Sequence, residues 1–456
     1  MEKNKVKFID LFAGLGGVRL GFEKSFQNLG FETECVMTSE IKPYAINTLK
    51  KNFEHDSFAG DIFKVDNNSI PDFDFLLAGF PCQPFSSGGK RQGFLDTRGT
   101  LFFEIERILE DKKPYGFILE NVEGLVKHDL ENKNDEIGQT LITIVNKLEK
   151  ELGYKVSWKV LDSIQFGLPQ SRKRIFIVGT KDEIVDLNIV ESNFSVLKDI
   201  LEQGLETLNS DFVEKLFSHY EIEELYGKSI KDKRGGKNNI HSWDIGIKGS
   251  VSKEQSLLLN QLFKERRRKQ WAEEIGIDWM DGMPLTLSQI QTFYSQDLFA
   301  KPIDLKVLLD DLVEKGYLRF EHPKKLVKER TENGIKTYRV YDETKPKGYN
   351  IVTGKLSFEV NKILDPDSIA PTLVATDVSR LAVPDGDGIR KLTIREGLRL
   401  FGYPEWYEIP AKETEAFDLL GNTVAVPVVE HVANKLGGIY KKHLNYITSS
   451  KVPVCS

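Results

Sequence analysis

The chain has 456 residues, of which 40% are hydrophobic and 29% charged, and its formal net charge is −6. This composition is typical of a globular protein and excludes a low-complexity chain, while the length favours two domains over one. A slightly acidic chain has no overall attraction for a polyanion, so any nucleic-acid surface must be local.

Strand and helix patterns alternate through the first 180 residues. The patterns predict strands at 7–12, 33–39, 74–78, 117–119, 155–161 and 175–178, and helices at 18–29, 43–52 and 139–152. Strict alternation of this kind predicts an α/β fold with a doubly wound, mostly parallel sheet. Ligands of such sheets bind at the carboxyl ends of the strands.

The character of the chain changes near residue 181. From there to about residue 365 it is polar, with charge clusters and short helices, and strand and turn patterns return at 370–373, 394–396 and 421–424. We therefore expect a catalytic domain at 1–183, an insertion at 184–366, and a segment at 367–456 that completes the first domain.

A glycine-rich turn, residues 10–17, joins the first strand to the first helix. Its glycines let the backbone approach a ligand, although a tight corner would use them too. The dinucleotide fingerprint would need a glycine at position 19, where Arg19 stands, so hydride-transfer cofactors are disfavoured. Glu40 and Asp61 end the next two strand units. Each alone would read as a solvated carboxylate, but with the turn they outline a pocket for an adenosine-bearing ligand without a pyrophosphate.

Cys82 stands between two prolines directly after the apolar strand 74–78. A thiol held there on a stiff backbone is placed for chemistry, although most free cysteines are inert and buried. The segment 86–93 that follows has three glycines and two cations, the composition of a loop that could close over a substrate. Arg172 and Arg174 alternate along a predicted strand and so share a face.

The insertion has a local pattern of its own. Leu305, Leu308, Leu309 and Leu312 share one helical face, a second helix is predicted at 286–294, and Asn333-Gly334 predicts a hairpin turn before the strand 336–340. Helix, helix and hairpin resemble a winged-helix module that reads DNA. Seven Lys or Arg against three Asp or Glu between 319 and 339 give a local excess of +4. A small α+β subdomain with solvated charges is the alternative, and 265–271 and 233–237 are further basic candidates.

Taken in order, these motifs resemble those of the DNA (cytosine-5) methyltransferases of bacterial restriction–modification systems. The matching segments are the glycine turn 10–17, Glu40, Asp61, Pro81-Cys82-Gln83, Glu120-Asn121-Val122, residues 170–174, residues 395–400 and Gly421-Asn422-Thr423-Val424. They cover about 1–180 and 369–440. One departure is Leu419-Leu420, where the family often has a glutamine just before the last Gly-Asn pair.

The resemblance implies S-adenosyl-L-methionine as the cofactor and duplex DNA as the partner. The residues it assigns to the cofactor are Phe12, Ala13, Gly14, Leu15, Gly16, Gly17, Glu40, Ile41, Asp61, Ile62, Pro81, Leu101, Asn422 and Val424. It assigns recognition of the DNA sequence to the insertion.

The expected chemistry begins with a thiolate, which is the protein nucleophile best suited to adding at C6 of cytosine. Cys82 is the candidate, and Glu120, at the end of a neighbouring predicted strand, would be the acid that meets N3 of the base. Arg172 and Arg174 would, by the resemblance, lie at the base and its phosphate. The target cytosine must leave the duplex before it can react.

Three alternatives stay open on the sequence: an RNA cytosine-5 methyltransferase of related fold, a DNA-binding relative without activity, and a small-molecule methyltransferase. The insertion favours duplex DNA over RNA, the complete motif set disfavours an inactive relative, and a small-molecule enzyme would need neither the insertion nor the two arginines.

The sequence also bears on compartment and assembly. No signal peptide, membrane span, disulfide framework or metal-ligand spacing is evident, so we expect a cytoplasmic monomer without a metal or a membrane partner. An endonuclease acting on the same sequence without a stable complex is the further partner expected.

Overall fold

A computed structural model describes residues 5–54, 57–80, 100–132, 134–189, 194–232, 235–280, 282–294, 304–331, 334–353, 358–376 and 378–450. The chain divides into two compact units: unit 1 comprises Met1–Gly204, Asp365–Ser379 and Leu392–Ser456, and unit 2 comprises Leu205–Leu364 and Arg380–Lys391. The expected division at 183 and 366 differs from these units in two places. The link as far as Gly204 groups with unit 1, and Arg380–Lys391 groups with unit 2.

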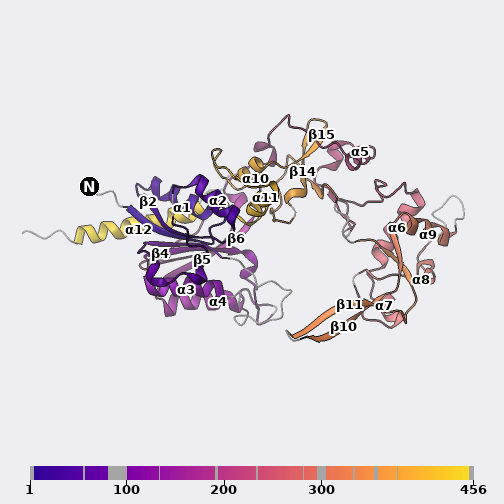
Figure 1. The fold of residues 1–456 in the computed structure, drawn as a ribbon, viewed down its shortest axis with the longest axis horizontal. Helices are drawn as coiled ribbons and strands as arrows, with labels where there is room; N and C mark the ends of the chain where they lie inside the picture. Colours follow the sequence, from indigo (N-terminus) through magenta and orange to yellow (C-terminus); the bar gives the residue numbers. More distant parts are fainter. Residues whose placement is uncertain are drawn as a thin grey trace, which may run out of the picture. The chain divides into compact units, whose positions relative to one another are not determined.

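Unit 1 is built on a sheet with the strand order β2-β1-β3-β4-β6-β5 (Figure 1). The strands are β1 (Lys5–Leu11), β2 (Glu32–Ser39), β3 (Phe75–Gly79), β4 (Gly116–Val122), β5 (Lys155–Asp162) and β6 (Lys173–Thr180). β2, β1, β3 and β4 run parallel, and β6 is antiparallel to both β4 and β5. The sheet is therefore mostly parallel, as the alternating pattern predicts.

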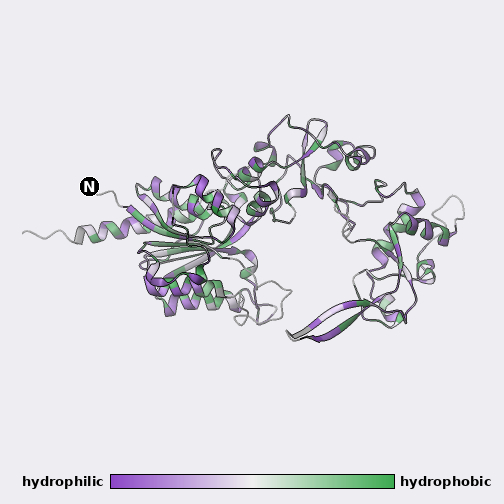
Figure 2. Cartoon of the chain, viewed as in Figure 1, coloured by the Kyte–Doolittle hydropathy of each residue, from purple (hydrophilic) through white to green (hydrophobic). Residues whose placement is uncertain are grey.

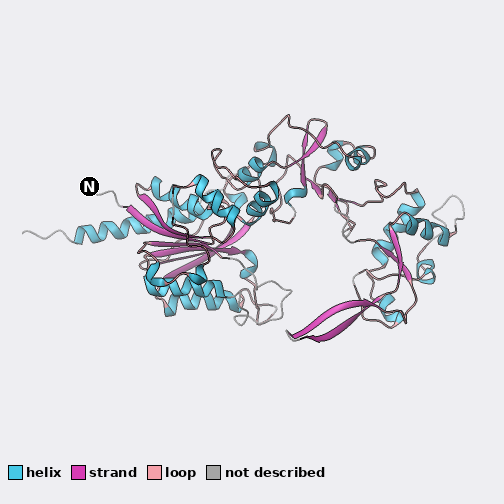
Figure 3. Cartoon of the chain, in the orientation of Figure 1, coloured by secondary structure: helices cyan, strands magenta, loops and turns pink. Residues whose placement is uncertain are grey.

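Helices cover both faces of this sheet (Figure 3). Those of unit 1 are α1 (Gly17–Asn28), α2 (Pro43–Asn52), α3 (Thr100–Lys112), α4 (Gln139–Asn146), α10 (Ile394–Leu400), α11 (Glu413–Asn422) and α12 (Val426–Ser450). Along these helices hydrophobic residues alternate with hydrophilic ones, as expected of helices with one buried side (Figure 2). Among the described helices, none combines the length and apolarity that crossing a membrane requires.

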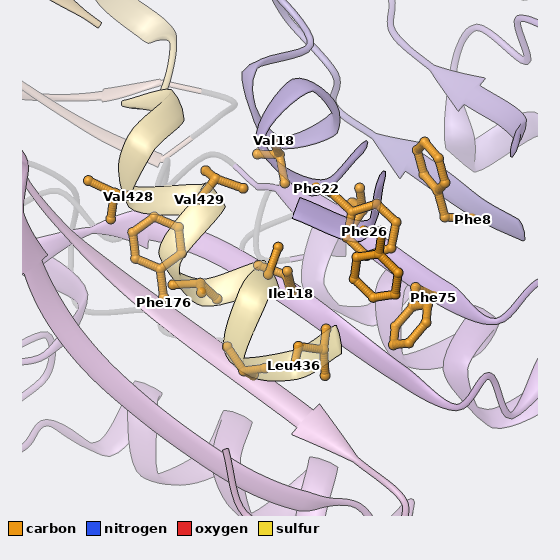
Figure 4. Close-up of a cluster of buried hydrophobic side chains, with 14 of the residues drawn as sticks. Phe8, Val18, Phe22, Phe26, Phe75, Ile118, Phe176, Val428, Val429 and Leu436 are labelled. Atoms are coloured by element: carbon orange, nitrogen blue, oxygen red, sulfur yellow. The ribbon is translucent and has the colours of Figure 1, made fainter. Parts of the chain in front are cut away.

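Alternate residues of each strand enter different cores, which explains the continuous apolar runs. In β3, Phe75 and Leu77 pack in one core, while Leu76 and Ala78 pack in the other. The first core joins the sheet to α1 and α12, and the second joins it to α3 and α4. Figure 4 shows the first core, in which the side chains of Phe8, Val18, Phe22, Phe26, Phe75, Ile118, Phe176, Val428, Val429 and Leu436 converge.

The C-terminal segment differs from its sequence pattern. Residues 394–396 lie in helix α10 and not in a strand, because Thr393 and Glu396 cap that helix reciprocally. Ala370 forms only an isolated bridge with Gln170, and Gly421 and Asn422 end helix α11. The strand expected in this segment is therefore replaced by two helices that lead into the long helix α12.

Unit 2 contains two large hydrophobic cores and a small cluster of Ala272, Met280 and Met283. One gathers α5 (Asp211–Phe217) with a sheet of order β15-β14-β13-β7-β8. Those strands are β7 (Ser229–Ile230), β8 (Asn239–Ile240), β13 (Lys362–Ile363), β14 (Leu381–Asp385) and β15 (Gly388–Lys391). The other gathers α6 (Lys253–Glu265), α7 (Gln270–Ile275), α8 (Leu287–Gln291), α9 (Leu305–Glu314), β9 (Leu318–Glu321) and β12 (Gly348–Ile351).

The second core has the topology of a winged helix. β9 pairs with β12, and Leu285, which precedes α8, bridges to Tyr349 in β12. The element order is thus helices α6 and α7, a bridging strand residue, helices α8 and α9, strand β9, a hairpin and strand β12. The hairpin, β10 (Lys324–Thr331) and β11 (Gly334–Tyr341), extends from this body as a long ribbon (Figure 1).

Candidate active site

The carboxylate of Glu120, at the end of β4, lies beside the end of β3, after which the chain continues to Pro81 and Cys82. Gly79 and Glu120 are register partners, and a Cβ built on Gly79 would lie 3.4 Å from Oε2 of Glu120. The buried Asn121 donates from Nδ2 to the carbonyl oxygen of Phe80 at 3.1 Å, which fixes the backbone at the last described residue before the prolines. Pro81, Cys82 and the segment 86–93 lie outside the described residues.

Glu120 forms an ion pair with Arg174 at the carboxyl end of β4. Nε of Arg174 lies 3.0 Å from Oε1 of Glu120, and both side chains are mostly buried. Burial raises the pKa of the Glu120 carboxyl above its ordinary value, although the nearby Arg174 and Arg172 cations oppose the rise. A carboxyl of this kind can hold a proton closer to neutrality than an exposed one, which suits a general acid.

Arg172 occupies a different environment from Arg174. Its buried guanidinium donates to the carbonyl oxygens of Leu373 (2.9 Å), Thr423 (2.6 Å) and Gly421 (3.2 Å). It also stacks over the ring of Phe401, 5.1 Å from the centroid. Burial lowers the pKa of the guanidinium to about 9. Arg172 therefore ties the start of β6 to the C-terminal segment, whereas Arg174 pairs with the acid.

The glycine turn has the strained backbone that its sequence indicates. Gly14 and Gly16 have φ values of 53° and 65°, and Phe12, at 57°, adopts the same left-handed conformation without being a glycine. Such strain costs about 1–3 kcal/mol at a non-glycine residue and is found mostly at functional sites. A Cβ on Gly14 would have only the carbonyl oxygen of Phe12, at 4.0 Å, as a neighbour. The backbone of Phe12, Ala13 and Gly14 is half-buried and open on this side.

The C-terminal segment braces the other half of the turn. Tyr407 donates from its hydroxyl to the carbonyl oxygen of Leu15 at 2.5 Å. A Cβ on Gly17 would lie 2.6 Å from the Tyr403 hydroxyl and 2.9 Å from Val424, so only glycine fits there. Leu15, Gly16, Gly17 and Val424 are buried, and they shape the turn from inside.

Glu40 holds the turn through its carboxylate. Oε2 accepts from the backbone N–H of Gly14 at 2.8 Å, and Oε1 accepts from those of Ile41 and Lys42 at 2.8 and 2.9 Å. A carboxylate offers about four lone-pair positions, so these three bonds leave one for a ligand hydroxyl. The side chain of Ile41 is 69% exposed, which is unusual for isoleucine and suits an apolar platform beside that carboxylate.

The next strand unit presents an exposed apolar residue beside the one expected. Asp61 accepts from the backbone N–H of Phe63 at 3.2 Å and so begins a short 3₁₀ turn. Ile62 is buried in the core, while Phe63 is 50% exposed. The resemblance assigns Ile62 to the cofactor, and its neighbour Phe63 adds an exposed apolar side chain at the same place.

The remaining predicted cofactor residues are spread over two helices. Leu101 is half-buried at the start of α3 and packs against the second core. Asn422 is exposed at the end of α11, where its Nδ2 donates to the carbonyl oxygen of Asp418 at 2.8 Å. Asp418 in turn accepts from Tyr44 at 2.7 Å, which links α11 to α2.

The residues around the turn fit an adenosine-bearing ligand. The open backbone at Gly14, the free acceptor position of Glu40 and the exposed side chains of Ile41 and Phe63 offer polar and apolar contacts at the carboxyl edge of the sheet. Asp10, just before the turn, is fully buried, and burial raises the pKa of its carboxyl to about 7. Within the described ranges no group of three or more metal-ligating side chains comes together.

Comparison with known proteins gives a family and close relatives. The family model described as C-5 cytosine-specific DNA methylase matches residues 6–438. The type II methyltransferase M.NlaIV of Neisseria lactamica is 56% identical over 95% of this chain and 99% of its own length. M.NgoBV of Neisseria gonorrhoeae is 55% identical over the same shares, and M.BanI of Aneurinibacillus aneurinilyticus is 42% identical over 95% and 96%.

Solved structures agree in fold. A DNA modification methyltransferase encoded within an Escherichia coli prophage superposes with a TM-score of 0.51 at 20% identity, covering 96% of this chain and 99% of the other. The methyltransferase EhMeth of Entamoeba histolytica superposes with a TM-score of 0.52 at 13% identity over the same shares. The expected methyltransferase fold is thereby confirmed.

Proposed function

The chain belongs to the C-5 cytosine-specific DNA methylase family, and from this premise we propose how its residues carry out the reaction. It is a DNA (cytosine-5) methyltransferase of the type II restriction–modification kind, as its sequence motifs predicted. The substrate is a cytosine turned out of duplex DNA, because a stacked and paired base cannot present C6 to a thiol.

The methyl donor we propose is S-adenosyl-L-methionine, held at the glycine turn. Its ribose hydroxyls would bond to the free acceptor position of Glu40, and its adenine would lie against Ile41 and Phe63, with Asp61 accepting from the amino group. When bound, it supplies an electrophilic methyl group. The open side of Gly14 and the three backbone bonds that already fix Glu40 support this placement.

For the base we propose Cys82 as the nucleophile and Glu120 as the acid. The Cys82 thiolate forms a bond to C6, which places negative charge on the pyrimidine, and Glu120 donates its proton to N3. C5 is then nucleophilic enough to accept the methyl group. Loss of the C5 proton to a base, return of the N3 proton to Glu120 and departure of the Cys82 thiolate together restore the neutral aromatic ring.

The observation that carries this assignment is the position of Glu120. It is the register partner of Gly79, three residues before Cys82, and its pKa is raised by burial. Arg174 orients the carboxylate and offers a cation to the base or its phosphate. Arg172 has its terminal nitrogens committed to three backbone carbonyls, so we assign it a positioning role.

We assign sequence recognition to unit 2, which contains the predicted insertion 184–366 apart from its first 21 residues and its last two. The winged-helix topology of its second core supports this assignment, because modules of this kind commonly read DNA. We further propose that the protein acts as a cytoplasmic monomer, and that an endonuclease acts on the same sequence without forming a stable complex with it.

A methyl-transfer assay tests the proposal. With labelled S-adenosyl-L-methionine the wild type should label duplex DNA and not tRNA, and bisulfite sequencing should place the label at cytosines in one sequence context. Cys82→Ala should abolish transfer, and Glu120→Gln should reduce it about a hundredfold, as removal of a positioned acid typically does. Labelling of tRNA alone, or unchanged turnover by either variant, would overturn the corresponding assignment.

A further inference from the structure

The ribbon β10–β11 has two faces of different charge. Its strands pair from Lys324 opposite Tyr341 to Thr331 opposite Gly334. Because side chains alternate along a strand and directly opposed residues share a face, this register sorts the ribbon's side chains into two sets. The first set is Lys324, Leu326, Lys328, Arg330, Thr337, Arg339 and Tyr341, and the second is Lys325, Val327, Glu329, Lys336, Tyr338 and Val340.

The first set, which we name the cationic face, has four cations and no acid. Lys328, Arg330 and Arg339 are exposed, and no ion pair within the described part of the chain involves them. Nζ of Lys324 lies 4.8 Å from the centroid of the Tyr341 ring, a cation–π contact that leaves its charge in place. Uncompensated cations in a row along an extended element are the usual electrostatic signature of a phosphate-binding surface.

The second set, which we name the balanced face, has its charges compensated. Nζ of Lys325 lies 3.2 Å from Oδ1 of Asp342, and Glu329 stands directly opposite Lys336. The positive charge that the sequence shows between 319 and 339 is therefore concentrated on one side of the ribbon.

Helix α9 is less suited than the ribbon to enter a groove of the DNA. Its exposed residues include Asp310 and Glu314, and the cation beside them, Lys306, is paired with Asp310 at 2.6 Å. A helix inserted in a DNA groove lies close to phosphates of both strands, and these phosphates would repel Glu314, while Lys306 has its charge already neutralised by Asp310. The charge distribution therefore favours the ribbon over the helix.

The dimensions and surroundings of the ribbon also fit DNA. Each strand has eight residues, which corresponds to about 25 Å, and a two-stranded ribbon fits the major groove, about 12 Å wide. Leu326 is 49% exposed on the cationic face, where it could contact a thymine methyl group. A hollow of about 800 Å³ at the base of the ribbon is lined by Lys248, Arg319, Lys347 and one acid, Glu321, so its charge is positive on balance.

We propose that the ribbon β10–β11 enters the major groove of the target DNA and that its cationic face meets the nucleic acid. This inference rests on the proposed function, and adds to it the element and the face that make contact.

Two double variants of the full chain test the proposal, since they remove equal charge from the two faces. Lys328→Gln with Arg339→Gln alters the cationic face, and Lys325→Gln with Lys336→Gln alters the balanced face. Affinity for a fluorescent duplex containing the target is measured from 50 to 300 mM salt. The cationic pair should flatten the dependence of log K on log salt by about two units, since each lost phosphate contact removes about 0.9. The balanced pair should leave the slope within about 0.3 of the wild type.

Further variants separate the ribbon from the helix and from misfolding. Arg330→Gln alone should flatten the slope by about one unit, and Glu314→Gln on α9 should leave affinity unchanged within about twofold. Equal flattening by both double variants, an unchanged slope in the cationic pair, or a large gain with Glu314→Gln would overturn the proposal. Methylation of DNA at low salt by these variants would show that the proposed function holds independently, whereas a wild type that fails to methylate DNA would overturn that function itself.

Discussion

The two arginines at the start of β6 should respond differently to substitution by lysine. In Arg172→Lys, one ammonium replaces a planar fork that reaches the carbonyl oxygens of Leu373, Gly421 and Thr423. At least one buried carbonyl, and at most two, would lose its donor, at about 1–3 kcal/mol each. We expect a destabilisation of about 3 kcal/mol, which for a unit of this size lowers the melting temperature by about 6 °C.

Arg174→Lys is the matched control for that experiment. Its one ion pair with Glu120 can be kept by lysine, so the melting temperature should change by less than about 2 °C. Calorimetry gives the melting temperatures, and hydrogen exchange followed by mass spectrometry should show faster exchange around Thr423 only in Arg172→Lys. Equal stability of the two variants, or faster exchange in both, would refute the separation of a positioning arginine from a site arginine.

Three further predictions concern Asp10, Glu40 and Asn121. The folded pKa of Asp10 is about 7 against an ordinary value of 3.8, so between these pH values the unfolded chain is ionised while the folded chain stays protonated. Stability from this group therefore falls as pH rises from about 4 to 7, by on the order of 4 kcal/mol, and levels off above. The urea midpoint of Asp10→Asn should therefore rise relative to that of the wild type as the pH increases from about 4 to 7. A difference between the two midpoints that does not depend on pH would contradict the predicted fall in wild-type stability. Glu40→Gln should weaken S-adenosyl-L-methionine binding at least tenfold by calorimetry without loss of DNA binding, whereas unchanged affinity would place the ribose elsewhere. Asn121→Ala frees the carbonyl oxygen of Phe80 and should lower kcat about tenfold while KM for the cofactor stays constant, and a rise in KM alone would exclude this positioning role.

The fold of unit 1 was accessible from the sequence because its signals are local. A strand buried on both faces, such as Phe75–Gly79, must be apolar throughout, and each such run was recognised. Thr393 and Glu396 also show the sequence pattern of a capping box, which marks the start of a helix, although the short segment 394–396 suggests a strand.

The sequence pattern does not indicate helix α12, and the reason is a different one. Gly437 and Gly438 interrupt its sequence pattern as helix breakers would. In the structure a Cβ on Gly437 would lie 2.5 Å from Leu29 and 3.2 Å from Phe26, so this glycine permits close approach to α1. Such a packing requirement cannot be read from one segment alone.

Some site residues can likewise be identified from local motifs, while the roles of others depend on contacts with distant parts of the chain. Motif spacing identified Glu40 and Glu120, but the different environments of Arg172 and Arg174 depend on carbonyl groups some 200 to 250 residues away in the chain. Ile62 and Phe63 are adjacent in the sequence and both apolar, so only burial distinguishes the two. The charge asymmetry of the ribbon follows from strand register, which a count of charges over 319–339 does not contain.

Covalent trapping on DNA that carries 5-fluorocytosine at the target position tests the central claim most directly. Fluorine at C5 blocks the final elimination, so a thiol that has added at C6 stays bonded to the base. We predict that, with S-adenosyl-L-methionine present, the wild type forms a denaturation-resistant complex and that mass spectrometry of its peptides places the nucleotide on Cys82. Absence of a covalent complex under conditions in which ordinary DNA is methylated, or a nucleotide attached to Cys35 or Cys455, would contradict the account.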